Sequence, residues 1–424
     1  MRIDFHPAIL DVQKYSCSCC GQGCRSFLVP VYPEERLTIE ALGDWREKLG
    51  VTRLFVKHRA AGAAEYGLAK RADGSCVFLD GDNLCIIHKL HGLKAKPLAC
   101  QLYPFVLSPV ENRLQVGLRF DCPAVCRSEG DNLCGYLGEI KRLAGRLIPV
   151  EMRRGPQLQI CPGQRGSAEQ IEAVNEVFIK IIAADAQDLL TRLHWLRGVT
   201  EHLGRVKWEK VEKKNFGDLL GTFQGGVLAE LQQRPFQRRE PSPKPRKLLR
   251  QIFFLLCQPT TMVAGPPEGF ASKLRGRLAL NRAAKQLRRT AGLLPKIQPD
   301  WPDCDLSRLE QSFGAWPGDV QQMLSRYLTC RIAGMGYCGA NFYGYSMAEG
   351  IQSLLLGMVT VGWLMRILAV KADREHIELS EAHRAVMTID GNLGYSSALG
   401  FGPARMRLKY LSEHLRDFTN WFCM

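Results

Sequence analysis

The stretch YSCSCCGQGCR, residues 15–25, places four cysteines within eight positions. A second stretch, GSCVFLDGDNLCIIHKLHGLKAKPLACQLYPF at residues 74–105, carries three more, and RFDCPAVCR at 119–127 adds a pair. Thiolates are soft ligands that suit zinc and iron–sulfur clusters, and cysteines two to four residues apart can turn two sulfurs toward one ion. The spacing therefore predicts a metal site in the N-terminal part of the chain.

The compartment follows from the same cysteines. The 424 residues contain 16 of them, ten before residue 135. Such a density belongs either to a cross-linked secreted protein or to a metal-binding protein in a reducing compartment. The N-terminus, MRIDFHPAILDVQKYSCSCC, lacks the basic region and apolar run of a signal peptide. We therefore expect a cytoplasmic protein with reduced thiols.

One stretch of the chain is long and apolar enough to raise the question of a membrane. It runs without a charge from Gly350 to Met365, sixteen residues, and Arg366 closes it. A helix that spans a bilayer needs about 20 such residues. We therefore predict a buried core helix and no membrane partner.

Turn signals in the first third of the chain predict short strands. Asp-Gly pairs at residues 73–74 and 80–81 flank CVFLD, LCIIHKL follows as a further strand, and SPVENR separates YPFVL from LQVGLRF as in a hairpin. Residues 38–50, TIEALGDWREKLG, predict one short helix with Thr38 as its N-cap and Gly50 as its stop.

From about residue 136 the apolar residues recur at spacings of three and four, which is typical of helices. Ser167 with Gln170 predicts a capping box, and a later helix is expected to open near Ser346. The predicted fold class is therefore α+β. A small, irregular, cysteine-rich metal-binding domain with short β-hairpins spans residues 1–135, and a mostly α-helical region spans residues 136–424.

The positive charge is concentrated in one segment. The chain has a formal net charge of +15, and residues 234–296 contain 15 basic and two acidic residues, a net +13. Such a cluster marks binding to nucleic acid or to an acidic partner, whereas a solvated helix face with an exposed linker is the simpler reading. Because no nucleic-acid fold or aromatic platform accompanies it, an acidic protein substrate or partner, or an anionic small molecule, is favoured over nucleic acid.

The identity of the metal stays open at this level. One zinc ion takes four ligands, fewer than the seven to nine candidates present. His88 and His91 follow Cys85 at three-residue steps and would suit zinc, although they also fit an exposed surface. Iron–sulfur clusters commonly use cysteine alone, which slightly favours iron. The remaining cysteines are expected to pack as small hydrophobic residues, namely Cys134, Cys161, Cys257, Cys304, Cys330, Cys338 and Cys423.

The pattern Cys17-x-x-Cys20-Gly-x-Gly-Cys24-Arg25, then VPVYPEE, then GSCVFLD…LCIIH…AKPLACQLYPF, resembles a family of zinc- or iron-chelating cysteine-cluster proteins that includes the flagellin lysine N-methylase. The resemblance covers about residues 15–130. It implies an iron–sulfur centre of the 4Fe-4S type, or zinc, and methyl transfer from S-adenosylmethionine to protein lysine. Matched position by position, it implies the metal ligands Cys17, Cys20, Cys24, Cys76, Cys85, Cys100 and Cys122.

The sequence departs from that family at Gly23, which stands where the family has the first cysteine of a Cys-Cys pair. No catalytic residue and no S-adenosylmethionine ligand can be assigned. The glycines of GMGYCG, residues 334–339, match a dinucleotide-binding pattern, but no acidic residue follows about 20 positions on, so we predict a tight connection between helices. Two hypotheses therefore stay open, a protein lysine methyltransferase and a non-catalytic metal-binding module.

Overall fold

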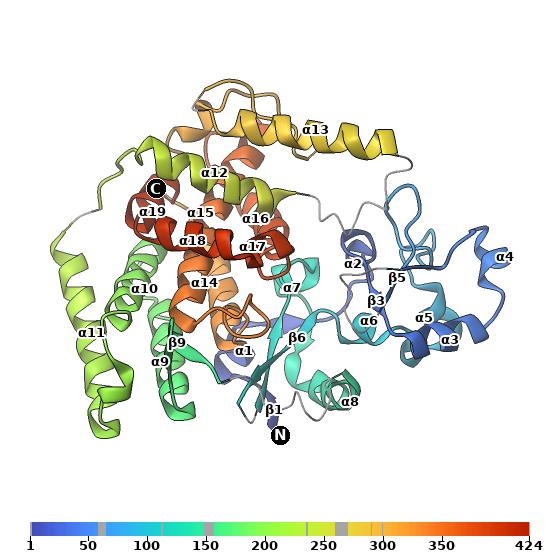
Figure 1. The fold of residues 1–424 in the computed structure, drawn as a ribbon, viewed down its shortest axis with the longest axis horizontal. Helices are drawn as coiled ribbons and strands as arrows, with labels where there is room; N and C mark the ends of the chain where they lie inside the picture. Colours follow the sequence, from blue (N-terminus) through green and yellow to red (C-terminus); the bar gives the residue numbers. More distant parts are fainter. Residues whose placement is uncertain are drawn as a thin grey trace.

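The computed structural model describes residues 2–57, 65–111, 113–147, 157–234, 236–258, 270–289, 291–298 and 300–423. In these residues the strands lie between Arg2 and Arg165, and the rest of the regular structure is helical (Figure 1). The predicted α+β class is confirmed. In Figure 1 a small lobe that contains α2 to α6 projects from a larger helical body.

Four small sheets contain all the strands of the described residues. The first has the order β1-β7-β6, in which β1 runs parallel to β7 and β6 pairs antiparallel with β7. The second has the order β3-β5-β4, and two antiparallel pairs, β2–β8 and β9–β10, complete the set. The strands are β1 (Arg2–Phe5), β2 (Lys14–Tyr15), β3 (Pro30–Val31), β4 (Phe55–Lys57), β5 (Tyr66–Leu68), β6 (Phe105–Val110), β7 (Arg113–Leu118), β8 (Asp131–Asn132), β9 (Gln159–Cys161) and β10 (Gln164–Arg165).

The helices divide between the two parts of the molecule. Those that precede residue 150 are α1 (Pro7–Val12), α2 (Gln22–Ser26), α3 (Pro33–Ala41), α4 (Trp45–Leu49), α5 (Ile86–His91), α6 (Leu98–Leu102), α7 (Pro123–Arg127) and α8 (Leu137–Leu147). Those that follow are α9 (Ala168–Ile182), α10 (Leu189–Leu203), α11 (Lys213–Gln233), α12 (Pro243–Cys257), α13 (Phe270–Leu287), α14 (Gly318–Ala333), α15 (Met347–Lys371), α16 (Leu379–Asp390), α17 (Ser397–Gly400), α18 (Gly402–Ser412) and α19 (Leu415–Phe422).

Two of the local predictions in the first third are wrong. LCIIHKL forms helix α5 instead of a strand, and CVFLD makes only single bridges, Lys70 with Cys76 and Leu79 with Cys85. A short apolar run fits either period, and here only Ile87 is fully buried, as on one side of a helix turn. The single helix predicted for residues 38–50 is also wrong. Thr38 lies inside α3, which begins at Pro33, and the chain turns between Leu42 and Asp44 before α4 begins.

Other local signals are confirmed. The hairpin between YPFVL and LQVGLRF is the β6–β7 pair. Ser167 and Gln170 form their capping box, and Ser346 caps the helix that opens after it. Gly50 adopts the left-handed conformation at the end of α4. Residues 334–339 connect α14 to α15 as predicted.

The predicted core helix is α15, which is buried along almost its whole length from Met347 to Val370. It is long and apolar enough to cross a membrane by composition, and the apolar part of it is wholly enclosed by protein. Two glycines allow neighbouring segments to approach it: a Cβ at Gly350 would lie 2.0 Å from the Tyr337 carbonyl, and one at Gly362 would lie 2.7 Å from the Phe422 carbonyl. The prediction of a buried core helix is confirmed.

The buried hydrophobic residues form two clusters. The smaller one contains Val29, Trp45, Phe78 and their neighbours in the small lobe. The larger one runs from Phe5 to Cys423 and includes β1, β6 and β7. The N-terminal segment thus packs on the helical body, where α1 contacts α14. The division of the chain near residue 135 stays a prediction.

A buried histidine in the helical body gives the fold a dependence on pH. His194 on α10 is 1% exposed, bonds Asn420 Oδ1 at 2.7 Å and stacks on Phe236. Burial, together with the nearby Arg197 guanidinium, lowers the pKa of His194 from 6.5 to about 4. The folded protein therefore favours the neutral ring.

Because the pKa of His194 is lower in the folded than in the unfolded state, neutral His194 favours the folded state. Its contribution to the free energy of unfolding is complete above pH 6.5. It is lost progressively as the pH falls from 6.5 toward 4, by about 3 kcal/mol in total. We expect the His194→Gln variant to lose most of this dependence in denaturant unfolding measured across that range. The His376→Gln variant, altered at a side chain that is 66% exposed, is the control and should keep the dependence. An unchanged pH profile for His194→Gln would contradict this account.

Candidate metal centre

The first two cysteine stretches are joined directly by hydrogen bonds. The backbone N–H of Cys76 donates to the carbonyl of Cys24 over 3.0 Å, and Lys70 Nζ donates to the same carbonyl over 2.7 Å. One residue beyond Cys24, the Arg25 guanidinium donates to Asn83 Oδ1 over 2.7 Å. Segments that are 46 to 58 residues apart in the chain are therefore held side by side at the cysteines.

Four cysteines gather in the cluster of the small lobe, each supplied by a different element. Cys24 lies in α2, Cys76 forms the single bridge with Lys70, Cys85 occupies the N-cap position of α5, and Cys100 lies in α6. All four pack in or against the small hydrophobic cluster. They lie close enough that thiolates at these positions would repel one another, since each of Cys24, Cys76 and Cys100 interacts electrostatically with others of the set. We call these four residues the inner thiols.

Burial sets the protonation of three inner thiols, Cys24, Cys76 and Cys100. It raises the pKa of Cys24, raises that of Cys76 to about 12, and raises that of Cys100 well above its usual value. These groups are thus protonated at neutral pH when no metal is bound. A metal that takes thiolates would displace those protons, so that its binding and proton release are coupled.

Two lysines partly offset the charge that the inner thiolates would carry. Lys70 and Lys96 both act to lower the pKa of Cys24. Burial works to lower the pKa of Lys96 itself, but nearby thiolates outweigh it and raise that pKa above its usual value. The thiolates responsible are, in decreasing order of effect, those of Cys100, Cys85, Cys24 and Cys17.

The other predicted ligands lie around Tyr15. Cys17 and Cys20 are exposed, whereas Cys122 is buried at the N-cap of α7. The Cys122 sulfur accepts hydrogen bonds from the backbone N–H groups of Val125 and Ala124, which oppose the rise of its pKa that burial causes. Cys122 interacts electrostatically with Cys20, and Tyr15 with both Cys17 and Cys122. We call Cys17, Cys20 and Cys122 the outer thiols.

The donor set can be tested against a soft metal. Within the described ranges, no three His, Cys, Asp or Glu side chains already stand in ligating positions around one point. The chemistry of the inner set nevertheless fits, because it offers four sulfurs, the number that one tetrahedral zinc or one four-iron cluster takes. Metal binding would draw the sulfurs together. The seven ligand assignments stay predictions.

The remaining candidates have other roles. His88 and His91 are both exposed on α5, and the ring of His91 packs against Trp45 at 5.7 Å, so both fit the surface of the helix. Cys126 is buried, and its sulfur donates to the His383 carbonyl of the helical body. The cysteines predicted to pack in the core are buried, namely Cys161, Cys257, Cys304, Cys330, Cys338 and Cys423, whereas Cys134 is exposed.

A polar cluster at the junction with the helical body was not anticipated from the sequence. Arg119 lies over the ring of Tyr395 at 3.9 Å and over Phe27 at 5.1 Å, and it pairs with Asp121. The ring of Tyr103 packs against Phe27, and its hydroxyl donates to Asp121. Burial raises the pKa of Asp121 even though Arg119 opposes this. The sequence signal for this cluster is the acidic residue of Phe120-Asp121-Cys122, directly before a predicted metal ligand.

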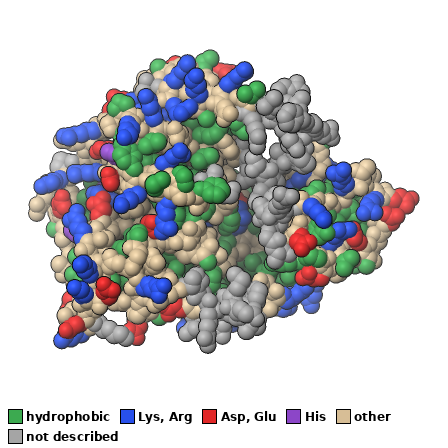
Figure 2. All heavy atoms as spheres, viewed as in Figure 1, with side chains coloured by type: hydrophobic (Ala, Val, Ile, Leu, Met, Phe, Trp, Pro, Cys, Tyr) green, Lys and Arg blue, Asp and Glu red, His purple; other side chains and the backbone are tan. Residues whose placement is uncertain are grey.

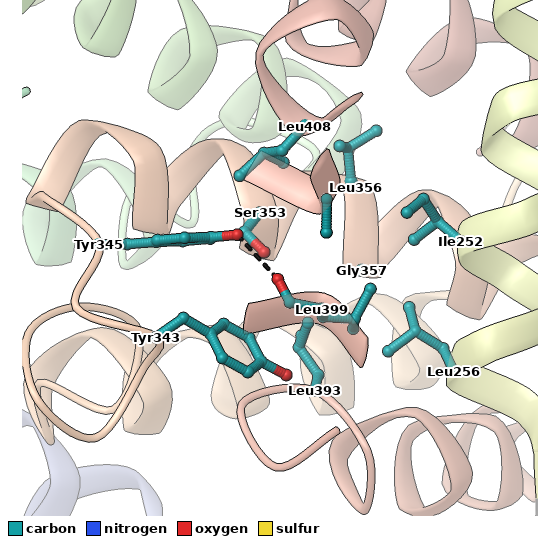
Figure 3. Close-up of a pocket in the computed structure, with 11 residues that line it drawn as sticks. Ile252, Leu256, Tyr343, Tyr345, Ser353, Leu356, Gly357, Leu393, Leu399 and Leu408 are labelled. Atoms are coloured by element: carbon teal, nitrogen blue, oxygen red, sulfur yellow. Dashed lines mark hydrogen bonds between the residues drawn. The ribbon is translucent and has the colours of Figure 1, made fainter. Parts of the chain in front are cut away.

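A pocket in the helical body is of a different kind (Figure 3). Its wall is mostly aliphatic, with the rings of Tyr343 and Tyr345 on one side, and the Tyr345 hydroxyl donates to the Leu399 carbonyl over 3.0 Å. The described residues that line it carry no charged group and no thiol. It therefore adds nothing to the metal chemistry of the small lobe.

The geometry thus defines a cysteine-rich domain equipped for a soft metal. Residues 16–127 match the family model described as "Putative zinc- or iron-chelating domain", and this part of the chain carries that domain. The family resemblance seen in the sequence is confirmed for these residues. No curated protein and no solved structure matches the chain.

Gly23, where the family pattern has cysteine, has little space for a side chain. A Cβ at this position would lie 3.1 Å from Cε1 of Tyr103, whose ring is held by Phe27 and Asp121. Within this lobe, a larger residue at position 23 requires the ring of Tyr103 to move.

We therefore expect the Gly23→Ala variant to lower the free energy of unfolding by about 1 kcal/mol. The matched control is Gly225→Ala in α11, where a Cβ would meet no atom within 4 Å. Alanine favours a helix, so this variant should be more stable than the parent by about 0.5–1 kcal/mol. Urea unfolding of both variants measures the difference in their free energies of unfolding. Equal stabilisation by the two substitutions would show that the Tyr103 ring moves aside at no cost.

Proposed function

We propose that the small lobe binds an iron–sulfur centre through the inner thiols. The observation that carries the proposal is the convergence of four cysteines, from four separate elements, on one small hydrophobic cluster next to Lys70 and Lys96. Isolated core cysteines need no neighbouring thiols, whereas an iron–sulfur cluster takes four thiolates and tolerates their charge only with compensation nearby.

Three features favour iron–sulfur over a single zinc. The outer thiols exceed what one zinc requires. The sulfur of Cys76 accepts a hydrogen bond from the N–H of Phe78, and that of Cys122 accepts two, which is a common setting for cluster sulfurs. His88 and His91, the histidines that would suit zinc, are exposed on α5, and His91 packs on Trp45. When bound, the centre supplies electron transfer or a structural brace, and the two lysines balance the charge of the thiolates.

Protein made and purified without oxygen should contain iron and acid-labile sulfide and show a broad absorbance in the visible. Cys76→Ser and Cys100→Ser should each remove most of both, because each takes away one inner ligand. Cys134→Ser, at an exposed thiol outside both sets, should retain them. A colourless protein that holds one zinc instead would overturn the iron–sulfur proposal and leave a zinc module. Unchanged metal content in both inner variants would overturn the ligand assignment.

The activity that the metal centre would support is a separate point. The family resemblance implies methyl transfer from S-adenosylmethionine to protein lysine, and the feature that supports an enzyme is the junction cluster. There Arg119, Asp121 and Tyr103 set a buried carboxylate and a phenol beside the thiols, and Tyr395 keeps 39% of its surface exposed. Perturbed buried groups in such a place are typical of functional sites. The competing hypothesis is a non-catalytic interaction module folded by its metal.

Labelled S-adenosylmethionine separates these hypotheses. We expect the metal-loaded protein to bind the compound and to transfer label to lysines of an added acidic protein. Asp121→Asn should reduce the transfer, because it removes the buried carboxylate. The iron content should stay at the parent level, because Asp121 is not one of the proposed metal ligands. Absence of both binding and transfer by protein with full metal content would favour the module.

A further inference from the structure

A groove lined by cations lies between α12 and the end of α13. Its volume is about 610 Å³, and the described residues that line it are Pro243, Lys247, Lys285, Arg288, Arg289 and Ala291. The four basic side chains are exposed. Figure 2 shows Lys and Arg side chains gathered at the top of the molecule, where Figure 1 places α12 and α13.

A buried arginine fixes one wall of this groove. The Arg250 guanidinium, 1% exposed, pairs with Glu310 and donates to the carbonyls of Leu287 and Arg289. It therefore holds the end of α13 and the residues just after it against α12. The buried contacts of Arg250 thus fix the backbone of Arg288 and Arg289 beside Lys247, which a solvent-exposed loop without such contacts would not do.

The charge of the groove is not neutralised within the described parts of the chain. The described residues that line it include no acidic residue. Acidic groups nearby have other partners: Glu240 pairs with Arg246, Glu310 pairs with Arg250, and Asp305 accepts a hydrogen bond from the backbone N–H of Gly292. Four cations around one concave space repel one another, which opposes folding unless an anion offsets it. The arrangement therefore favours binding of a negatively charged partner.

An apolar position extends the groove along α13. Leu278, Arg282 and Lys285 follow one another at steps of four and three, which places them along one side of α13. Arg289 follows just beyond the end of the helix. Leu278 is 47% exposed, so the stripe begins apolar and ends basic. A partner that matches it carries acidic residues with an apolar side chain at one end.

We infer that this groove binds an acidic segment of another protein. A concave site suits an extended chain or a helix better than a flat bilayer, and its lining includes no aromatic ring on which bases of single-stranded nucleic acid would stack. Arginine pairs with carboxylates through two parallel N–H bonds, which suits glutamate and aspartate side chains. The inference does not depend on the metal centre.

The test uses the full-length, metal-loaded protein and a fluorescein-labelled peptide of glutamates and leucines. We expect binding that weakens as salt is added. The double variant Lys247→Glu, Arg288→Glu should weaken it at least about ten-fold, and the milder Lys247→Ala, Arg288→Ala pair should weaken it less. Lys180→Glu with Arg205→Glu, at exposed cations of other elements, makes the same change in net charge and should leave the affinity near that of the parent.

Equal losses in the groove and control variants would show only a general charge effect and overturn the inference. Tighter binding to random-sequence duplex DNA or to vesicles of anionic lipid, sensitive to the groove variants, would assign the groove to those partners instead. Far-UV circular dichroism and iron content of each variant establish that it is folded.

Discussion

The buried carboxylate of Asp390, at the end of α16, is the contact on which the placement of the metal-binding lobe depends. It is fully buried, and it accepts a hydrogen bond from the backbone N–H of Phe120 over 2.7 Å and one from the Tyr327 hydroxyl. Arg331 lies 3.5 Å from it. A buried carboxylate without such partners costs several kcal/mol, so these elements must meet at one point. Phe120 is thereby fixed to the helical body, and Arg119, Asp121 and Cys122 are fixed with it.

From that point the chain of contacts leads into the small lobe. Asp121 pairs with Arg119 and accepts a hydrogen bond from the Tyr103 hydroxyl. The ring of Tyr103 packs on Phe27 and leaves little space for a side chain at position 23. Tyr103 follows α6, which supplies Cys100. The junction thus ties an outer thiol, Cys122, and an inner thiol to the same polar cluster. A change in the charge of a metal bound at these thiols would act most strongly on Arg119 and Asp121, because charges interact strongly where water is excluded.

The sequence allowed prediction of those features that rest on local chemistry. The capping box at Ser167, the hairpin of β6 and β7, the core helix α15 and the presence of a chelating domain all follow from short spacings or from composition. Prediction failed where tertiary contacts decide. LCIIHKL is helical because Ile87 enters the small core, and the break at residues 42–44 depends on where Trp45 is buried. Lys70 and Lys96 escaped notice because their proximity to the thiols depends on pairing between distant segments.

The small lobe poses an energetic problem to which its cysteines are one solution. Its core consists of a few buried residues between Val29 and Ile87. A core of this size rarely contributes more than about 3–5 kcal/mol to the free energy of unfolding by itself. Burial makes Cys76 and Cys100 hard to ionise, so the metal-free lobe buries neutral thiols at little cost. The same burial gives a bound metal a water-poor site, and structural zinc sites contribute on the order of 10 kcal/mol or more to folding. Lys70 and Lys96 reduce the cost of converting thiols to thiolates. A metal bound by these thiols would therefore stabilise the small lobe, while the helical body, with its much larger core, holds the junction in place by its own contacts.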